Sequence, residues 1–180
     1  MIRFTAASAA ALLAAAPAFA QDVIDTEQES FTVEVVAEGF NFPWSIAFLP
    51  TGEMLVAERE GGLRVIAADR TLREAAVAGL PDDLIAIRQG GLMDVALSPD
   101  FADDRLVYFS YAEGTEDANR TALARGRLSE DLTELTGVED LFRANFDKRS
   151  GFHFGGRILF DDDGTLFLAL GDGGRYQDEA

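Results

Sequence analysis

The sequence predicts an all-β fold of the propeller type, and two features support this prediction. From Phe31 onward, short apolar runs alternate with turn residues, which is typical of strands joined by tight turns. A strand–turn–strand unit also returns along the chain, with Phe48, Leu97 and Phe160 in equivalent places at spacings of 49 and 63 residues. Blades of about 40–50 residues are typical of propellers, and longer ones carry larger loops. Other all-β architectures, such as sandwiches, also use short strands but do not require this returning hairpin.

The expected elements follow this pattern in order. Segment 21–30 is polar and is predicted to be a loose leader, whereas 31–36 alternates as a half-buried strand. Segments 70–78 and 130–142 contain helix formers but no sustained helical period, so both are predicted to be loops or short turns. Trp44 and Tyr111 are assigned to the core or to packing between blades. Three predicted hairpins have the strands 45–48 with 54–57, 92–97 with 105–111, and 157–160 with 165–170.

Segment 31–180 is therefore predicted to be a partial propeller with about three blades. A closed ring needs typically four to eight blades, so the sequence is expected to be a fragment. Such a fragment would expose unpaired strand edges and apolar blade faces.

The N-terminus resembles a secretory signal peptide over residues 1–20. Arg3 precedes an apolar run from Thr5 to Ala16, and Ala18 and Ala20 form a small-residue cleavage pattern. The run is shorter than the ~20 residues needed to span a bilayer. The mature chain is therefore expected to begin at Gln21, to contain no membrane span, and to be periplasmic or secreted.

Composition excludes several functions. The chain has 180 residues and a formal net charge of −17, which argues against nucleic acid, because phosphate binding depends on clustered Lys and Arg. It has no cysteine and one histidine, so cysteine nucleophiles and multi-histidine zinc sites are excluded. The motif Asp161-Asp-Asp-Gly164 resembles part of a calcium loop, but Leu170 stands where that loop needs a glutamate. It is predicted to be a plain hairpin turn.

The candidate catalytic residues are His153 and Asp172, which lie in the glycine-rich segments 151–157 and 171–174. If the turn at 161–164 pairs Phe160 with Thr165, continued pairing places His153 opposite Asp172. Opposed Cβ atoms lie about 4.5–5.5 Å apart, close enough for a carboxylate to orient an imidazole as a base. A local turn role for each residue is the alternative.

Four ordered motifs resemble the soluble glucose and aldose sugar dehydrogenases that depend on pyrroloquinoline quinone (PQQ). The likeness runs from about residue 31 to 177, nearly the whole mature chain. The motifs are Phe42-Pro-Trp-Ser-Ile-Ala-Phe-Leu-Pro-Thr-Gly52, Gln89-Gly-Gly-Leu-Met-Asp-Val-Ala-Leu-Ser-Pro-Asp-Phe101, His153-Phe-Gly-Gly-Arg157 and Gly171-Asp-Gly-Gly-Arg-Tyr-Gln177.

The resemblance implies a six-bladed β-propeller that oxidises an aldose at C1 to the lactone with PQQ and Ca²⁺. His153 matches the general base, Asp172 its acidic partner, and Gln89 and Gln177 match polar residues that line the cofactor and substrate pocket. The family's calcium ligands, and the cationic residues around PQQ, come largely from later blades, so this chain is not expected to hold the cofactor alone. Phe152 stands where soluble glucose dehydrogenases carry an acidic residue, which argues against a preference for glucose.

Two other functions are compatible with a propeller. A metal-dependent sugar lactonase would need several acidic and amide ligands near the axis, of which only Asp172 can be placed. A non-catalytic propeller that binds a carbohydrate or a protein would make the pairing of His153 with Asp172 incidental.

Overall fold

The computed structural model describes residues 23–145, 147 and 149–174, in two compact units that divide between Val35 and Val36. The predicted signal peptide lies outside the described residues. In the first unit, β1 (Val23–Asp25) pairs antiparallel with β2 (Ser30–Thr32). The predicted loose leader thus contains a strand. The predicted half-buried strand 31–36 is wrong, because the strand ends at Thr32 and residues 31–36 are all exposed. A two-stranded hairpin has no second layer of its own in which to bury apolar side chains.

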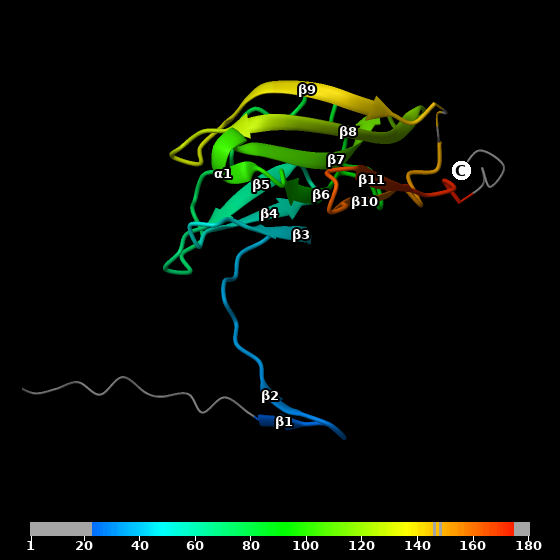
Figure 1. Ribbon diagram of the computed structural model, residues 1–180. Helices are drawn as coiled ribbons and strands as arrows, with labels where there is room; N and C mark the ends of the chain where they lie inside the picture. The colour runs from blue at the N-terminus through cyan, green and yellow to red at the C-terminus, as the bar shows by residue number, and fades with distance from the viewer. Residues whose placement is uncertain (1–22, 146, 148, 175–180) are drawn as a thin grey trace, which may run out of the picture. The chain divides into compact units, whose positions relative to one another are not determined.

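The second unit contains three antiparallel sheets and one short helix, α1 (Phe101–Asp104), in its described part. Among the described residues, none of the helical structure is long and apolar enough to cross a membrane. Each sheet joins strands in chain order (Figure 1). The strands are β3 (Pro43–Phe48), β4 (Met54–Glu58) and β5 (Gly62–Ile66) in one sheet, β6 (Leu92–Leu97), β7 (Leu106–Gly114), β8 (Asn119–Leu128) and β9 (Leu135–Arg143) in the next, and β10 (Gly155–Phe160) with β11 (Leu166–Leu170) in the last.

The three predicted hairpins are confirmed as β3–β4, β6–β7 and β10–β11. Phe48, Leu97 and Phe160 each end the first strand of their hairpin, as the repeat requires. The prediction of a loop or short turn over 130–142 is wrong, because β9 fills most of that segment and pairs with β8. Most of β9 is exposed, so its sequence lacks the alternation that reveals a half-buried strand.

The main core lies between the first two sheets of this unit. Leu55 and Leu63 from the first sheet and Val107, Phe109 and Tyr111 from the second are buried in one cluster. The assignment of Tyr111 to the core is therefore confirmed.

Trp44 does not lie in the core of the described residues, because its exposed fraction is 47%; its packing against another blade stays a prediction. Trp44, Ile46 and Phe48 alternate along β3 and are all exposed. The opposite face of the strand meets the second sheet, where Ser45 Oγ donates to Met93 O at 3.0 Å.

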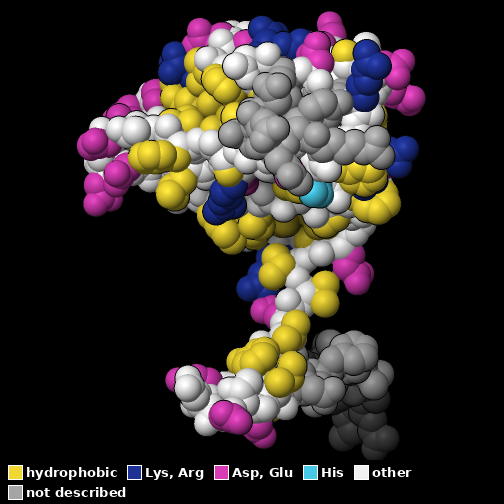
Figure 2. Space-filling view, turned by 90° about the vertical axis from the view of Figure 1, so that its right-hand side faces the viewer, with side chains coloured by type: hydrophobic (Ala, Val, Ile, Leu, Met, Phe, Trp, Pro, Cys, Tyr) yellow, Lys and Arg dark blue, Asp and Glu magenta, His cyan; other side chains and the backbone are white. Residues whose placement is uncertain are grey.

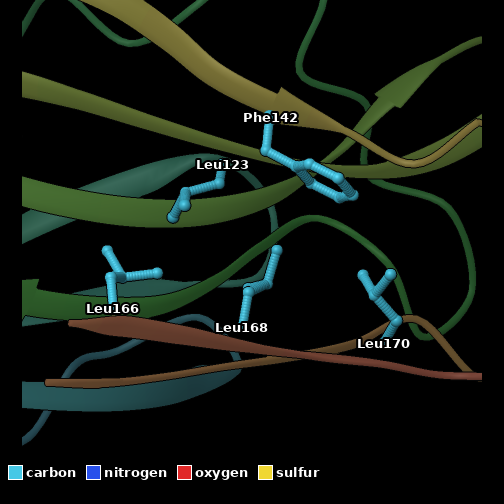
Figure 3. Close-up of a pocket in the computed structure, with 5 residues that line it drawn as sticks. All are labelled: Leu123, Phe142, Leu166, Leu168 and Leu170. Carbon is cyan, nitrogen blue, oxygen red and sulfur yellow. The ribbon is translucent and has the colours of Figure 1, made fainter. Parts of the chain in front are cut away.

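A smaller apolar layer joins the second sheet to β10–β11. Tyr108, Leu123 and Ile158 are buried there, and the rings of Tyr108 and Phe160 meet edge to face at 5.0 Å. Beside this layer lies an apolar groove of about 250 Å³ whose side chains converge from β8, β9 and β11 (Figure 3). The groove is lined by Leu123, Phe142, Leu166, Leu168 and Leu170. The three sheets are thus stacked through their faces, as blades are.

Candidate active site

The candidate site lies at the open end of the β10–β11 hairpin. Near the turn, Phe160 pairs with Leu166, one residue out of the predicted register. A bulge in β10 removes this offset before the open end, where Gly155 pairs with Leu170. The bulge thereby restores the predicted alignment for the residues beyond the strands, because one extra residue shifts every later pair by one.

His153 and Asp172 meet there as predicted. His153 Nδ1 lies 2.7 Å from Asp172 Oδ1. The pKa of Asp172 is held below its usual value first by the N–H of Gly174, which donates to Oδ1 at 2.8 Å, and then by His153. An ionised carboxylate only accepts hydrogen bonds, so Nδ1 carries the proton and Nε2 is the basic nitrogen of the neutral ring.

Both side chains can reach a ligand. The exposed fraction is 55% for the His153 side chain and 31% for Asp172, and the single histidine of the chain is visible at the surface (Figure 2). An oriented imidazole at an accessible position has the geometry of a general base.

Gln89 also belongs to this site. Its Oε1 accepts a hydrogen bond from His153 N at 3.0 Å, and its own N donates to Gly151 O at 3.1 Å. The loop before β6 is thus bonded to the loop before β10. The Nε2 of Gln89 has no hydrogen-bond partner among the described residues, so this amide can donate to a ligand. Gln177 lies outside the described residues.

The glycines of this segment allow the backbone to approach itself closely. Gly171 faces His153 O, and a Cβ at position 171 would lie 2.0 Å from that oxygen. Gly173 N donates to His153 O at 3.2 Å. His153 itself has a φ of +50°, which is uncommon outside glycine. The backbone that presents the imidazole therefore depends on glycine at position 171.

Three buried polar side chains hold the segment that follows His153, one each from β8, β7 and β6: Thr121, Ser110 and Asp94. We call them the anchor residues. Thr121 Oγ1 donates to Phe154 O at 2.8 Å, and Ser110 Oγ donates to Gly156 O at 2.6 Å. Ser110 Oγ also accepts from Asp94 N at 3.0 Å.

Asp94 completes the set. Its Oδ2 accepts from Ile158 N at 2.7 Å, and Oδ1 accepts from Val95 N at 3.1 Å and lies 3.4 Å from Arg157 Nη1. The β6 bulge between Leu92 and Val95 and the β10 bulge interrupt the strand ladders at these positions. Because buried backbone groups need partners, the anchor residues stabilise the bulge that aligns the site.

The sequence reasoning did not identify the anchor residues. The available signal was a polar residue inside an apolar strand, since Asp94 interrupts the run Leu92–Leu97 and Ser110 lies within β7. Such residues are almost always buried with partners, but the partner strand is set by tertiary packing.

The stacked antiparallel sheets define a partial β-propeller, with a histidine–carboxylate pair at the mouth of its last described hairpin. The chain belongs to the glucose/sorbosone dehydrogenase family, whose family model matches residues 40–180.

Three matches illustrate the likeness. The aldose sugar dehydrogenase YliI of Escherichia coli is 44% identical over 142 residues, which are 78% of this chain and 38% of the relative. The crystal structure of the soluble aldose sugar dehydrogenase of E. coli in its apo form matches with a TM-score of 0.73 at 42% identity, over 79% of this chain and 41% of that one. The PQQ-bound aldose sugar dehydrogenase of Streptomyces coelicolor matches with a TM-score of 0.68 at 32% identity, over 79% and 41%. The chain spans about two fifths of the length of these relatives.

The site's donors fit a quinone. An imidazole, an amide with N–H groups to donate, and a glycine-rich turn can contact a flat, oxygen-rich ligand. In the part of the chain that the structure describes, no group of three or more His, Cys, Asp and Glu side chains is placed to hold a metal ion.

Proposed function

We propose that the full protein oxidises an aldose at C1 to the lactone with PQQ, and that His153 is its general base. The observation that carries this proposal is the 2.7 Å contact between His153 Nδ1 and Asp172 Oδ1 at an accessible hairpin mouth. Membership of the glucose/sorbosone dehydrogenase family supports it.

Each residue has a role in this proposal. Asp172 stays ionised, fixes the proton on Nδ1 and stabilises the imidazolium that forms. His153 Nε2 removes the proton of the C1 hydroxyl, and the C1 hydrogen leaves as hydride with the two electrons of the oxidation. Gln89 and Gln177 are proposed to contact the cofactor and the sugar. When bound, PQQ supplies the electron acceptor.

Two further elements of the proposal concern the whole protein. Ca²⁺ is expected to be needed with PQQ, with its ligands mostly outside this chain. Export is expected from the sequence of residues 1–20, and comparison of periplasmic and cytosolic fractions by immunoblot tests it. Retention of the unprocessed protein in the cytosol would contradict the export proposal.

The test is dye-linked oxidation of aldoses by the protein made from its full reading frame, with and without added PQQ and Ca²⁺. His153→Gln is expected to lower kcat by about 10²–10⁴-fold, the usual contribution of a general base. Asp172→Asn is expected to lower kcat at least about tenfold, because the amide can hold His153 in the tautomer in which Nε2 carries the proton and cannot act as the base. Asp162→Asn, at the turn of the same hairpin, is the matched control and should be unchanged.

The outcomes separate the proposal from its alternatives. Activity that needs PQQ and collapses in His153→Gln supports the dehydrogenase. Sugar binding without oxidation, unaffected by His153→Gln, would instead indicate a binding propeller. Lactone hydrolysis that needs a metal and no PQQ would indicate a hydrolase. Either of the last two results refutes the proposal.

A further inference from the structure

Two arginines lie together beside the His153 loop. Arg88 and Arg149 line a hollow of about 310 Å³ whose other lining residues are Ser150 and Phe152. We call it the arginine hollow. The chain has 32 acidic and only 15 basic residues, so two guanidinium groups at one hollow form a local exception to the acidic character of the molecule.

Neither guanidinium is neutralised by the described residues. No ion pair within 4 Å joins Arg88 or Arg149 to a described carboxylate. By contrast, six other arginines form such ion pairs, at positions 59, 64, 120, 125, 143 and 157. Glu116 and Asp117 line a neighbouring hollow of about 450 Å³ that shares the two arginines, yet they form no ion pair with them. Two like charges that repel one another and form no ion pair with the described residues attract an anion.

Packing holds Arg88 in place. Its guanidinium carbon lies 5.1 Å from the centre of the Phe152 ring, within the range of a cation–π contact. Its Cδ passes Gly151 so closely that a Cβ there would lie 3.1 Å away. Its carbonyl accepts a hydrogen bond from Arg59 Nη1 at 2.9 Å. The hydrogen bond holds the Arg88 backbone, and the contacts with Phe152 and Gly151 restrict its side chain before a ligand arrives, which reduces the entropy lost on binding.

The arginine hollow is joined to the His153–Asp172 pair at both ends. Gln89, which follows Arg88, accepts the hydrogen bond from His153 N. Ser150 Oγ donates at 2.6 Å to Gly173 O, in the turn that carries Asp172. A ligand that places its reacting carbon at His153 can therefore extend toward the two arginines.

Guanidinium groups bind carboxylate and phosphate oxygens through paired, charge-assisted hydrogen bonds. We propose that the arginine hollow binds an anionic group of the sugar, a carboxylate or a phosphate remote from C1, so that the substrate is an acidic sugar rather than a neutral hexose. This inference rests on the proposed function, because it names the substrate class of that site.

The test compares kcat/KM for glucose, glucuronate and glucose 6-phosphate in the full protein with PQQ. The charged sugars are expected to have the higher value, with glucuronate and glucose 6-phosphate distinguishing a carboxylate from a phosphate. Arg88→Gln and Arg149→Gln are each expected to lower the charged-to-neutral ratio of kcat/KM about tenfold or more, the effect of losing a charged hydrogen bond. Arg127→Gln, another exposed arginine without an ion pair among the described residues, is the control and should leave the ratio unchanged.

A second readout does not need activity. Calorimetric titration of the cofactor-free protein with glucuronate and glucose 6-phosphate should show binding that weakens in Arg149→Gln and in high salt. Equal ratios in parent and variants, with glucose still oxidised, would overturn this inference and leave the proposed function intact. If the variants instead raise only the PQQ concentration needed for half-maximal activity, the hollow serves the cofactor and the inference fails. If no sugar is oxidised, the proposed function fails, and calorimetry alone decides whether the hollow binds anions.

Discussion

Replacing Ser110 with alanine removes the central anchor residue. Ser110 is fully buried, and its hydroxyl bonds two backbone groups at once: it donates to Gly156 O at 2.6 Å and accepts from Asp94 N at 3.0 Å. Both groups lie at bulges where the strand ladders are interrupted. Because alanine has no hydroxyl, it leaves both of these backbone groups without this partner.

The magnitude follows from the two bonds. Leaving one buried polar group unpaired costs about 1–3 kcal/mol, so Ser110→Ala is expected to lower the free energy of unfolding by about 3 kcal/mol. The bulge that aligns His153 with Asp172 should also loosen, so kcat is expected to fall about tenfold, since misplacement by about 1 Å can cost far more.

The assay is urea unfolding of the full protein, followed by fluorescence, together with dye-linked kcat. Ser30→Ala is the control, because Ser30 is exposed and its hydroxyl bonds only the exposed Asp25. Its change should stay within about 0.5 kcal/mol. A stability and kcat for Ser110→Ala equal to those of the control would refute the reasoning that the anchor residues hold the site.

Two further predictions concern the His153 loop. Gly171→Ala places a Cβ 2.0 Å from His153 O, so kcat should fall at least about tenfold. Gly164→Ala is the control: a Cβ there meets nothing within 4 Å, so this variant should lose only about 1–2 kcal/mol of stability, from the strain of alanine at a positive φ. An unchanged kcat in Gly171→Ala would contradict this prediction. The pKa of Asp172 lies below its usual 3.8, so its ionised form is stabilised by folding: the contribution is present above the unfolded pKa and disappears as pH falls through the folded pKa. The difference in urea midpoint between parent and Asp172→Asn should therefore still be present at pH 5 and shrink below about pH 4; a difference already lost between pH 6 and 5 is the contrary result.

Some of the fold could be predicted because turns and alternation are local signals. The hairpins at β3–β4, β6–β7 and β10–β11 were found from apolar runs around turn residues such as Asp161 and Gly164. The strand β9 could not be found in this way, because most of its side chains are exposed at the edge of the sheet, so its sequence does not need to alternate apolar and polar residues. The segment 31–36 shows the converse, since it alternates without forming a buried strand.

The geometry of the candidate site could be predicted to a similar extent. Counting along the hairpin placed His153 opposite Asp172, although the pairing next to the turn is one residue different and a bulge restores it. A bulge of this kind depends on partners far along the chain, so hairpin counting cannot reveal it. The role of Gln89 followed from family resemblance alone, because its contact with His153 joins residues 64 positions apart.

The anchor residues also have a consequence for the order of assembly during synthesis. The sheet β6–β9 joins neighbours in sequence, so it can form from short loops that close at little entropic cost. The bonds that hold β10 reach back 33, 46 and 64 residues, to Thr121, Ser110 and Asp94. The earlier sheet is therefore expected to fold first and to act as a template, with its buried hydroxyl and carboxylate groups already in position when His153 leaves the ribosome.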